Sequence, residues 1–153
     1  MTLPYLVPLP AHGAADCGWL TVAEDANLPF AVKRVYWITA VPTGQVRGRH
    51  THRTLEQLFV ALNGTLRITV EAPGFTRHTF DLTHSKQALY VPPGSWREVQ
   101  FGAGAVLLCL ASQEYSEADY IREEGADSRQ SLAVARFVQA AHSLARATMF
   151  AAT

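Results

Sequence analysis

The chain has 153 residues, of which 48% are hydrophobic and 17% charged, and its formal net charge at pH 7 is zero. This composition is typical of one folded globular domain and excludes a disordered chain. The balanced charge argues against nucleic acid or an anionic membrane as a partner, and no run of about 18 apolar residues is present to span a bilayer.

The N-terminal 29 residues are rich in Pro, Gly, Ala and Asp, and one short strand is expected there, at 18–22. The first ten residues hold three prolines and no Lys or Arg, which is unlike a secretory signal. The two cysteines, Cys17 and Cys109, form no CxxC pair. A reducing, cytoplasmic location is therefore expected.

Short runs rich in β-branched and aromatic residues fill the middle of the chain. Strands are expected at 30–41, 45–52, 55–62, 65–71, 77–82, 88–92, 96–101 and 105–111. Turn signals separate several of them, above all Asn63-Gly64, which favours a tight hairpin, and Pro92-Pro93-Gly94. Many short strands joined by such turns predict an antiparallel sandwich or barrel.

The C-terminal part of the chain has a different character. Residues 114–124 are expected to form a helical turn or two, and 130–150 are rich in Ala, Leu, Arg and Gln without Pro or Gly, which predicts a helix. We expect a barrel domain over 1–128 and a helical extension over 129–153, laid on the barrel or on a partner subunit. A frayed tail is the alternative.

Two histidines lie two residues apart on the strand expected at 45–52. Side chains at i and i+2 point to the same face, so His50 and His52 are expected to face one ion or one substrate carbon. Imidazole titrates near neutral pH, which suits it to proton transfer. In an arbitrary protein such a pair is more often structural than catalytic.

The spacing of Gly44, His50, His52 and Glu56 resembles the first motif of the cupins, and residues 92–97 resemble the second. In metal-binding cupins the second motif ends in a ligand histidine, where this chain has Arg97. A permanently charged guanidinium opposes a cation at that position. We therefore expect no bound metal.

A more specific resemblance is carried by several strings in order: KRVYWI at 33–38, RGRHTHRTLEQ at 47–57, LNG at 62–64, LYVP at 89–92, Trp96, LAS at 110–112 and DYIR at 119–122. Over about residues 28–124 the chain resembles the nucleotide-sugar 3,4-ketoisomerases, which are WxcM-like cupins acting on dTDP-4-keto-6-deoxyglucose. The resemblance implies a homodimeric, cofactor-free double-stranded β-helix (jelly-roll) barrel. Relatives usually carry a histidine at the position of Arg97.

The catalytic residues expected from this resemblance are His50 or His52 as the base that removes the C3 proton, with the other as shuttle or hydrogen-bond partner. Tyr36 is the candidate acid or sugar-orienting group, although a strand tyrosine is equally often a core residue. Arg47 is the candidate for stabilising the enediolate oxygen. Strict alternation would put Arg47 on the face opposite His50, unless Gly48 marks a bulge.

The remaining candidates are expected to bind substrate. Arg34 and Arg97 are assigned to the diphosphate, and Tyr90 or Trp96 to stacking on the thymine. Glu56 is expected to hydrogen-bond the histidines. Further along, Asp119 and Arg122 are expected to form a local pair.

Two other function classes remain open at this point. The first is a non-catalytic nucleotide-sugar-binding cupin, which Arg97 in place of the usual histidine favours. The second is a metal-dependent cupin enzyme that uses His50, His52 and Glu56. Proton exchange in D2O distinguishes the first from an isomerase, and elemental analysis distinguishes the second.

Overall fold

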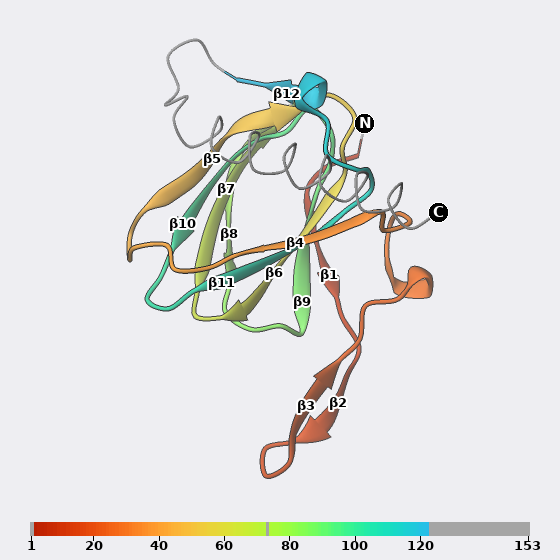
Figure 1. The fold of residues 1–153 in the computed structure, drawn as a ribbon, viewed down its shortest axis with the longest axis vertical. Helices are drawn as coiled ribbons and strands as arrows, with labels where there is room; N and C mark the ends of the chain where they lie inside the picture. The colour runs from red at the N-terminus through yellow and green to blue at the C-terminus, as the bar shows by residue number, and fades with distance from the viewer. Residues whose placement is uncertain (1, 73, 123–153) are drawn as a thin grey trace, which may run out of the picture.

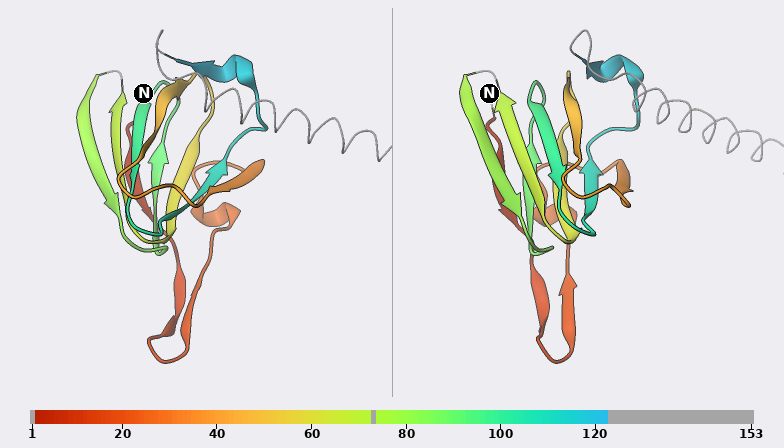
Figure 2. Two further views of the ribbon diagram at one scale, coloured as in Figure 1. Left: turned by 60° about the vertical axis from the view of Figure 1, so that its left-hand side comes forward. Right: turned by 90° about the vertical axis from the view of Figure 1, so that its left-hand side faces the viewer.

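A computed structural model describes residues 2–72 and 74–122, and this part of the chain is almost entirely β (Figure 1). Two five-stranded antiparallel sheets face each other, as the edge-on views in Figure 2 show. The first has the order β1-β9-β6-β11-β4 and the second β12-β5-β10-β7-β8. This arrangement confirms the predicted antiparallel two-sheet fold.

The strands are short and joined by turns. The first sheet consists of β1 (Tyr5–Pro8), β4 (Arg34–Ile38), β6 (Gln57–Asn63), β9 (Gln87–Val91) and β11 (Val106–Ala111). The second consists of β5 (Val46–His52), β7 (Leu66–Ala72), β8 (Phe75–Leu82), β10 (Trp96–Phe101) and β12 (Tyr120–Ile121). A separate hairpin pairs β2 (Ala11–Ala14) with β3 (Gly18–Thr21), and two 3-10 turns are η1 (Asp25–Asn27) and η2 (Glu117–Asp119).

Alternation along the strands of the first sheet creates two apolar clusters. On β6, Phe59 and Ala61 point between the sheets into the main core, while Leu58 and Val60 pack on the outer face. The outer face is covered by the segment that carries Leu28, Phe30 and Val32. Strand β6 is therefore buried on both faces, and its run of apolar residues is explained by this double burial.

The β2–β3 hairpin projects beyond the end of the two-sheet body, opposite the end where β12 lies (Figure 1). Two of its large apolar side chains are exposed, Trp19 at 52% and Leu20 at 64%. The ammonium group of Lys86 lies 3.1 Å from the centre of the Trp19 ring. This hairpin, residues 11–21, is called the arm below.

The strands expected from the sequence at 18–22 and from 45 to 111 are confirmed with small shifts of their ends. The strand expected at 30–41 is shorter, because only Arg34–Ile38 pairs with β11. Strands β1 and β2 were missed, since their prolines and glycine conceal the pattern. The turn of helix expected at 114–124 is reduced to η2, and β12 follows it.

The helical extension predicted over 129–153 lies outside the described residues. Within residues 2–72 and 74–122, no helix is long and apolar enough to cross a membrane.

The turn at Asn63-Gly64 provides a test of the fold. Gly64 has φ 64°, and a Cβ there would lie 2.8 Å from the backbone of Ala103 and Ala105. Gly44 has φ 82° but open space around it. Gly44→Ala is expected to destabilise by about 1 kcal/mol from backbone strain alone, and Gly64→Ala by more than about 2 kcal/mol. Urea unfolding measures both, and equal losses would contradict the close packing of this turn.

Candidate active site

The paired histidines lie at the end of β5, where β12 pairs with it. Tyr120 of β12 pairs with His52. Its ring centre lies 4.3 Å from that of His52 and 4.9 Å from that of His50. The two imidazoles meet edge to face, with centres 5.1 Å apart. The spacing of two residues on a strand thus brings both rings together, and β12 covers them.

A β-bulge at Gly48-Arg49 sets the direction of the side chains before the histidines. Both residues have positive φ, 97° and 53°, and the register with β10 shifts here. As a result His50 pairs with Arg97 and Arg47 pairs with Val99, whose side chain belongs to the core. Arg47 therefore faces the same side as His50. Within the described chain, the side chain of Arg47 makes no hydrogen bond or ion pair.

Arg97 comes from β10 and is only 3% exposed. One terminal nitrogen of its guanidinium donates to the carbonyl oxygen of His50 at 2.9 Å, and the other lies 2.7 Å from His50 Nε2. A guanidinium is always a donor, so Nε2 accepts. His50 Nδ1 lies 2.8 Å from the carbonyl of Gly48, to which it donates. The tautomer of His50 is therefore protonated at Nδ1.

Both histidines are neutral in this environment. Burial lowers the pKa of His50 to about 2, with further lowering by the Arg97 charge. Burial likewise lowers the pKa of His52 to about 2, with Arg97 and then Arg34 as the next causes. Desolvation and nearby cations both disfavour an imidazolium. Each ring keeps one nitrogen lone pair at physiological pH.

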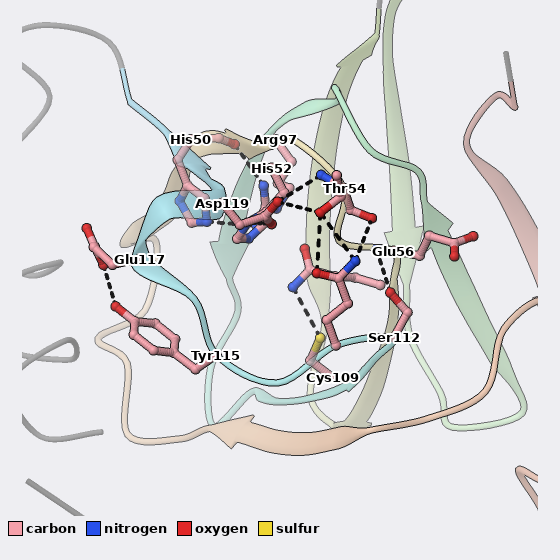
Figure 3. Close-up of polar contacts among 12 residues, drawn as sticks. His50, His52, Thr54, Glu56, Arg97, Cys109, Ser112, Tyr115, Glu117 and Asp119 are labelled. Atoms are coloured by element: carbon pink, nitrogen blue, oxygen red, sulfur yellow. Dashed lines mark hydrogen bonds and ion pairs between the residues drawn. The ribbon is translucent and has the colours of Figure 1, made fainter. Parts of the chain in front are cut away.

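Asp119, in η2, contacts the second histidine (Figure 3). Its Oδ2 lies 2.9 Å from His52 Nδ1, at an angle outside that of a hydrogen bond, and because His52 is neutral the contact is between the carboxylate charge and the imidazole dipole. Oδ1 accepts from the amide and the hydroxyl of Thr54, both at 2.8 Å. The pairing of Asp119 with Arg122 expected from the sequence is wrong, because Arg122 pairs with Glu117. The contact between Asp119 and His52 could not be predicted from sequence spacing, because the two residues come together only when β12 pairs with β5.

Tyr36, on β4, lies among buried groups that include Gln57 and Cys109. Its hydroxyl accepts a hydrogen bond of 2.8 Å from the side-chain amide of Gln57, which also lies 3.4 Å from Cys109 Sγ. The Arg34 guanidinium is 5.4 Å from the Tyr36 ring centre and 5.7 Å from that of Tyr115. Burial, followed by Cys109, raises the pKa of Tyr36 well above its usual value. Tyr36 is therefore a neutral phenol that can donate.

The other sequence candidates face away from the histidines. Tyr90 donates to Glu56 at 2.7 Å, and Tyr90 belongs to the outer cluster of the first sheet. In Figure 3 the Glu56 carboxylate points away from His50 and His52. Trp96 pairs with Glu71 and precedes the inward-facing Arg97, so alternation directs it outward.

The arrangement has a defined chemical capacity. Two neutral imidazoles lie beside a buried cation, and Arg97 makes no ion pair with any carboxylate in the described chain. Among the described residues, no group of three or more His, Cys, Asp and Glu side chains is arranged to hold a metal ion. These groups suit abstraction of a proton next to an oxygen that becomes negative.

Comparison with known proteins gives consistent results. The family model FdtA, described as WxcM-like, C-terminal, matches residues 6–129. TDP-4-oxo-6-deoxy-alpha-D-glucose-3,4-oxoisomerase of Aneurinibacillus thermoaerophilus is 38% identical over 105 residues, which is 68% of this chain and 75% of that protein.

Solved structures are similar as well. A histidine-to-asparagine variant of the 3,4-ketoisomerase QdtA from Thermoanaerobacterium thermosaccharolyticum, in complex with TDP-4-keto-6-deoxyglucose, is 37% identical with a TM-score of 0.73, covering 78% of this chain and 87% of that one. The TDP-quinovose 3,4-ketoisomerase WlaRB from Campylobacter jejuni is 33% identical with a TM-score of 0.73, covering 80% and 95%.

The lowered histidine pKa values predict a dependence of stability on pH. Both groups have a pKa of about 2 when folded against about 6.5 when unfolded, so below pH 6.5 the unfolded chain binds more protons. The free energy of unfolding should therefore fall as the pH drops from 6.5 to 5, by up to about 1.4 kcal/mol per histidine and pH unit. Urea unfolding of the wild type and of the double variant His50→Gln/His52→Gln measures this.

The double variant is expected to show the shallower slope. Replacement of the exposed His84 by Gln should leave the slope as in the wild type. A double variant as steep as the wild type would show that the two rings are not held neutral.

Proposed function

The chain belongs to the WxcM-like, C-terminal (FdtA) family. From this membership and the geometry of the site, we propose that its reaction proceeds by proton transfer through histidine. The protein is a sugar 3,4-ketoisomerase that converts dTDP-4-keto-6-deoxyglucose to a dTDP-3-keto-6-deoxyhexose. The observation that carries the mechanism is a neutral imidazole, His50, in contact with a buried guanidinium that has no carboxylate partner among the described residues.

We assign removal of the C3 proton to His50. Its Nε2 is the unprotonated nitrogen, and the bond that this nitrogen accepts from Arg97 has to open when the substrate binds. His50 is partly exposed, whereas His52 is only 3% exposed. The pair of electrons from the C3–H bond forms the C3–C4 double bond, and the former keto oxygen at C4 becomes negative. Arg97 lies next to Nε2, where its charge stabilises this enediolate. Arg47, on the same face, is a second cation for that role.

The second half of the reaction returns the proton to carbon. The His50 imidazolium delivers it to C4, while the hydroxyl at C3 loses its proton and becomes the new keto group. The C4 oxygen takes up one proton, so protons balance without any other reactant. We assign the transfer between the two oxygens to His52 and to the neutral phenol of Tyr36. Arg34, beside Tyr36, is the candidate for the diphosphate.

The test is NMR of dTDP-4-keto-6-deoxyglucose incubated with the protein in D2O. The wild type should incorporate solvent deuterium and form the 3-keto product. His50→Asn and His52→Asn should each lower turnover by about 100-fold or more, because each removes a general acid–base group. His84→Asn, an exposed histidine outside the site, is the matched control and should keep full turnover.

Three outcomes would contradict the mechanism. Full turnover by both site variants would remove histidine from the chemistry. Thermal stabilisation by dTDP without deuterium exchange would indicate a nucleotide-sugar-binding module. Loss of turnover on treatment with a chelator, with metal found by elemental analysis, would indicate a metal-dependent cupin enzyme.

Several broader features belong to the same proposal. We assign the two described sheets to a double-stranded β-helix barrel, the domain expected over 1–128. No cofactor is required by the proton balance above. Cytoplasmic location is supported by Cys17 and Cys109, both of which are free thiols.

A homodimer is supported by apolar surface that one chain leaves bare. Val35 and Trp37 point outward from β4, the edge strand of the first sheet, and are 49% and 66% exposed. Trp19 and Leu20 are exposed on the arm. An unpaired edge with large apolar side chains is typical of a surface that binds another chain.

Sedimentation velocity tests this assembly. The wild type should sediment as a dimer, and Trp19→Glu and Trp37→Glu should each shift it toward monomer, since a buried carboxylate disfavours an apolar interface. Leu3→Glu changes an apolar residue of 44% exposure outside both surfaces and should leave the dimer intact. A monomeric wild type, or a dimer that survives both tryptophan variants, would contradict the assignment.

A further inference from the structure

Asp119 is the one acidic side chain among the buried residues of the described chain, and the mechanism above does not use it. The other carboxylates that form ion pairs, Asp81, Glu98 and Glu117, are 27–53% exposed. Burial of a carboxylate is unfavourable unless donors surround it. Asp119 is therefore a buried carboxylate whose charge lies next to the imidazole of His52.

The carboxylate is held in one orientation. The amide and hydroxyl of Thr54 both donate to Oδ1 at 2.8 Å, and the backbone carbonyl of Asp119 accepts from the amide of Arg53 at 2.9 Å. These contacts leave Oδ2 beside His52 Nδ1, 2.9 Å away, although not at the angle of a hydrogen bond. The carboxylate is thus fixed by the end of β5, the strand that carries the histidine it faces.

A carboxylate at this distance decides which nitrogen of a neutral imidazole carries the proton. A lone pair on Nδ1 would repel the Oδ2 lone pairs, whereas an N–H at Nδ1 is attracted by them. The proton therefore resides on Nδ1, and Nε2 keeps the lone pair. The negative charge also stabilises His52 when Nε2 takes up a proton, against the opposing charges of Arg97 and Arg34.

We propose that Asp119 is a positioning residue of the isomerase, which fixes the tautomer of His52 so that Nε2 can accept a proton during turnover. This inference rests on the proposed role of His52. Asp119 also precedes β12, whose Tyr120 covers both imidazoles, so a purely structural role in attaching β12 is the alternative.

Asp119→Asn tests the proposal with little change in shape. Its amide oxygen still accepts from Thr54, but the amide NH2 then faces Nδ1 and drives the His52 proton to Nε2. Turnover at neutral pH should fall at least about tenfold, with KM within about threefold of the wild type. Glu117→Gln, which changes an acidic residue of the same segment that is 50% exposed, is the matched control and should keep wild-type turnover.

Nitrogen-15 NMR of histidine-labelled protein reports the tautomer of His52, which would stay unchanged if Asp119 served only to attach β12. The wild type should show His52 protonated at Nδ1, and Asp119→Asn should show it protonated at Nε2. The double variant Asp119→Asn/His52→Asn should be no slower than His52→Asn alone, because Asp119 acts through that ring.

The outcomes separate this proposal from the proposed function. Full turnover by Asp119→Asn, in a protein whose His52→Asn variant is impaired, overturns the role of Asp119 alone. So does a loss of turnover with an unchanged His52 tautomer, or additive losses in the double variant. Full turnover by His52→Asn overturns both this proposal and the assignment of His52.

Discussion

The contact between Arg97 and His50 is the interaction on which the proposed mechanism depends. A guanidinium that is 3% exposed and has no carboxylate partner in the described chain is an unfavourable arrangement for stability alone. In the proposed mechanism its charge stabilises the enediolate, and together with burial it keeps the neighbouring imidazole neutral. Positive charge is thus positioned before substrate binds, and no water must reorganise during the reaction.

The fold holds this contact through backbone geometry. Pairing of β5 with β10 sets His50 opposite Arg97, and the bulge at Gly48 turns Arg47 to the same face. A Cβ on residue 48 would lie 2.7 Å from the carbonyl oxygen of Arg97, so glycine permits the two strands to approach. The bulge therefore sets the directions of three charged or titratable side chains of the site, those of Arg47, His50 and Arg97.

The two faces of the first sheet serve different purposes. Its inner face holds Tyr36, Gln57 and Cys109 near the site, while its outer face carries the bond between Tyr90 and Glu56. Part of the outer face is covered by the chain's own segment around Phe30, and Trp37 at the β4 edge remains exposed. The same sheet thus borders the proposed reaction site on one side and carries the proposed assembly surface on the other.

Sequence reasoning determined the features that depend on local pattern. Turn residues and β-branched runs predicted the strands, the spacing of two residues predicted that His50 and His52 share a face, and Arg97 identified a departure from metal-binding relatives. Only the tertiary structure decided which groups meet across strands. The Asp119–His52 contact, the bond between Gln57 and Tyr36 and the outward direction of Glu56 depend on strand register and sheet order. These are set by packing of the whole chain, because a pleated strand defines which residues share a face but not which strand lies beside it.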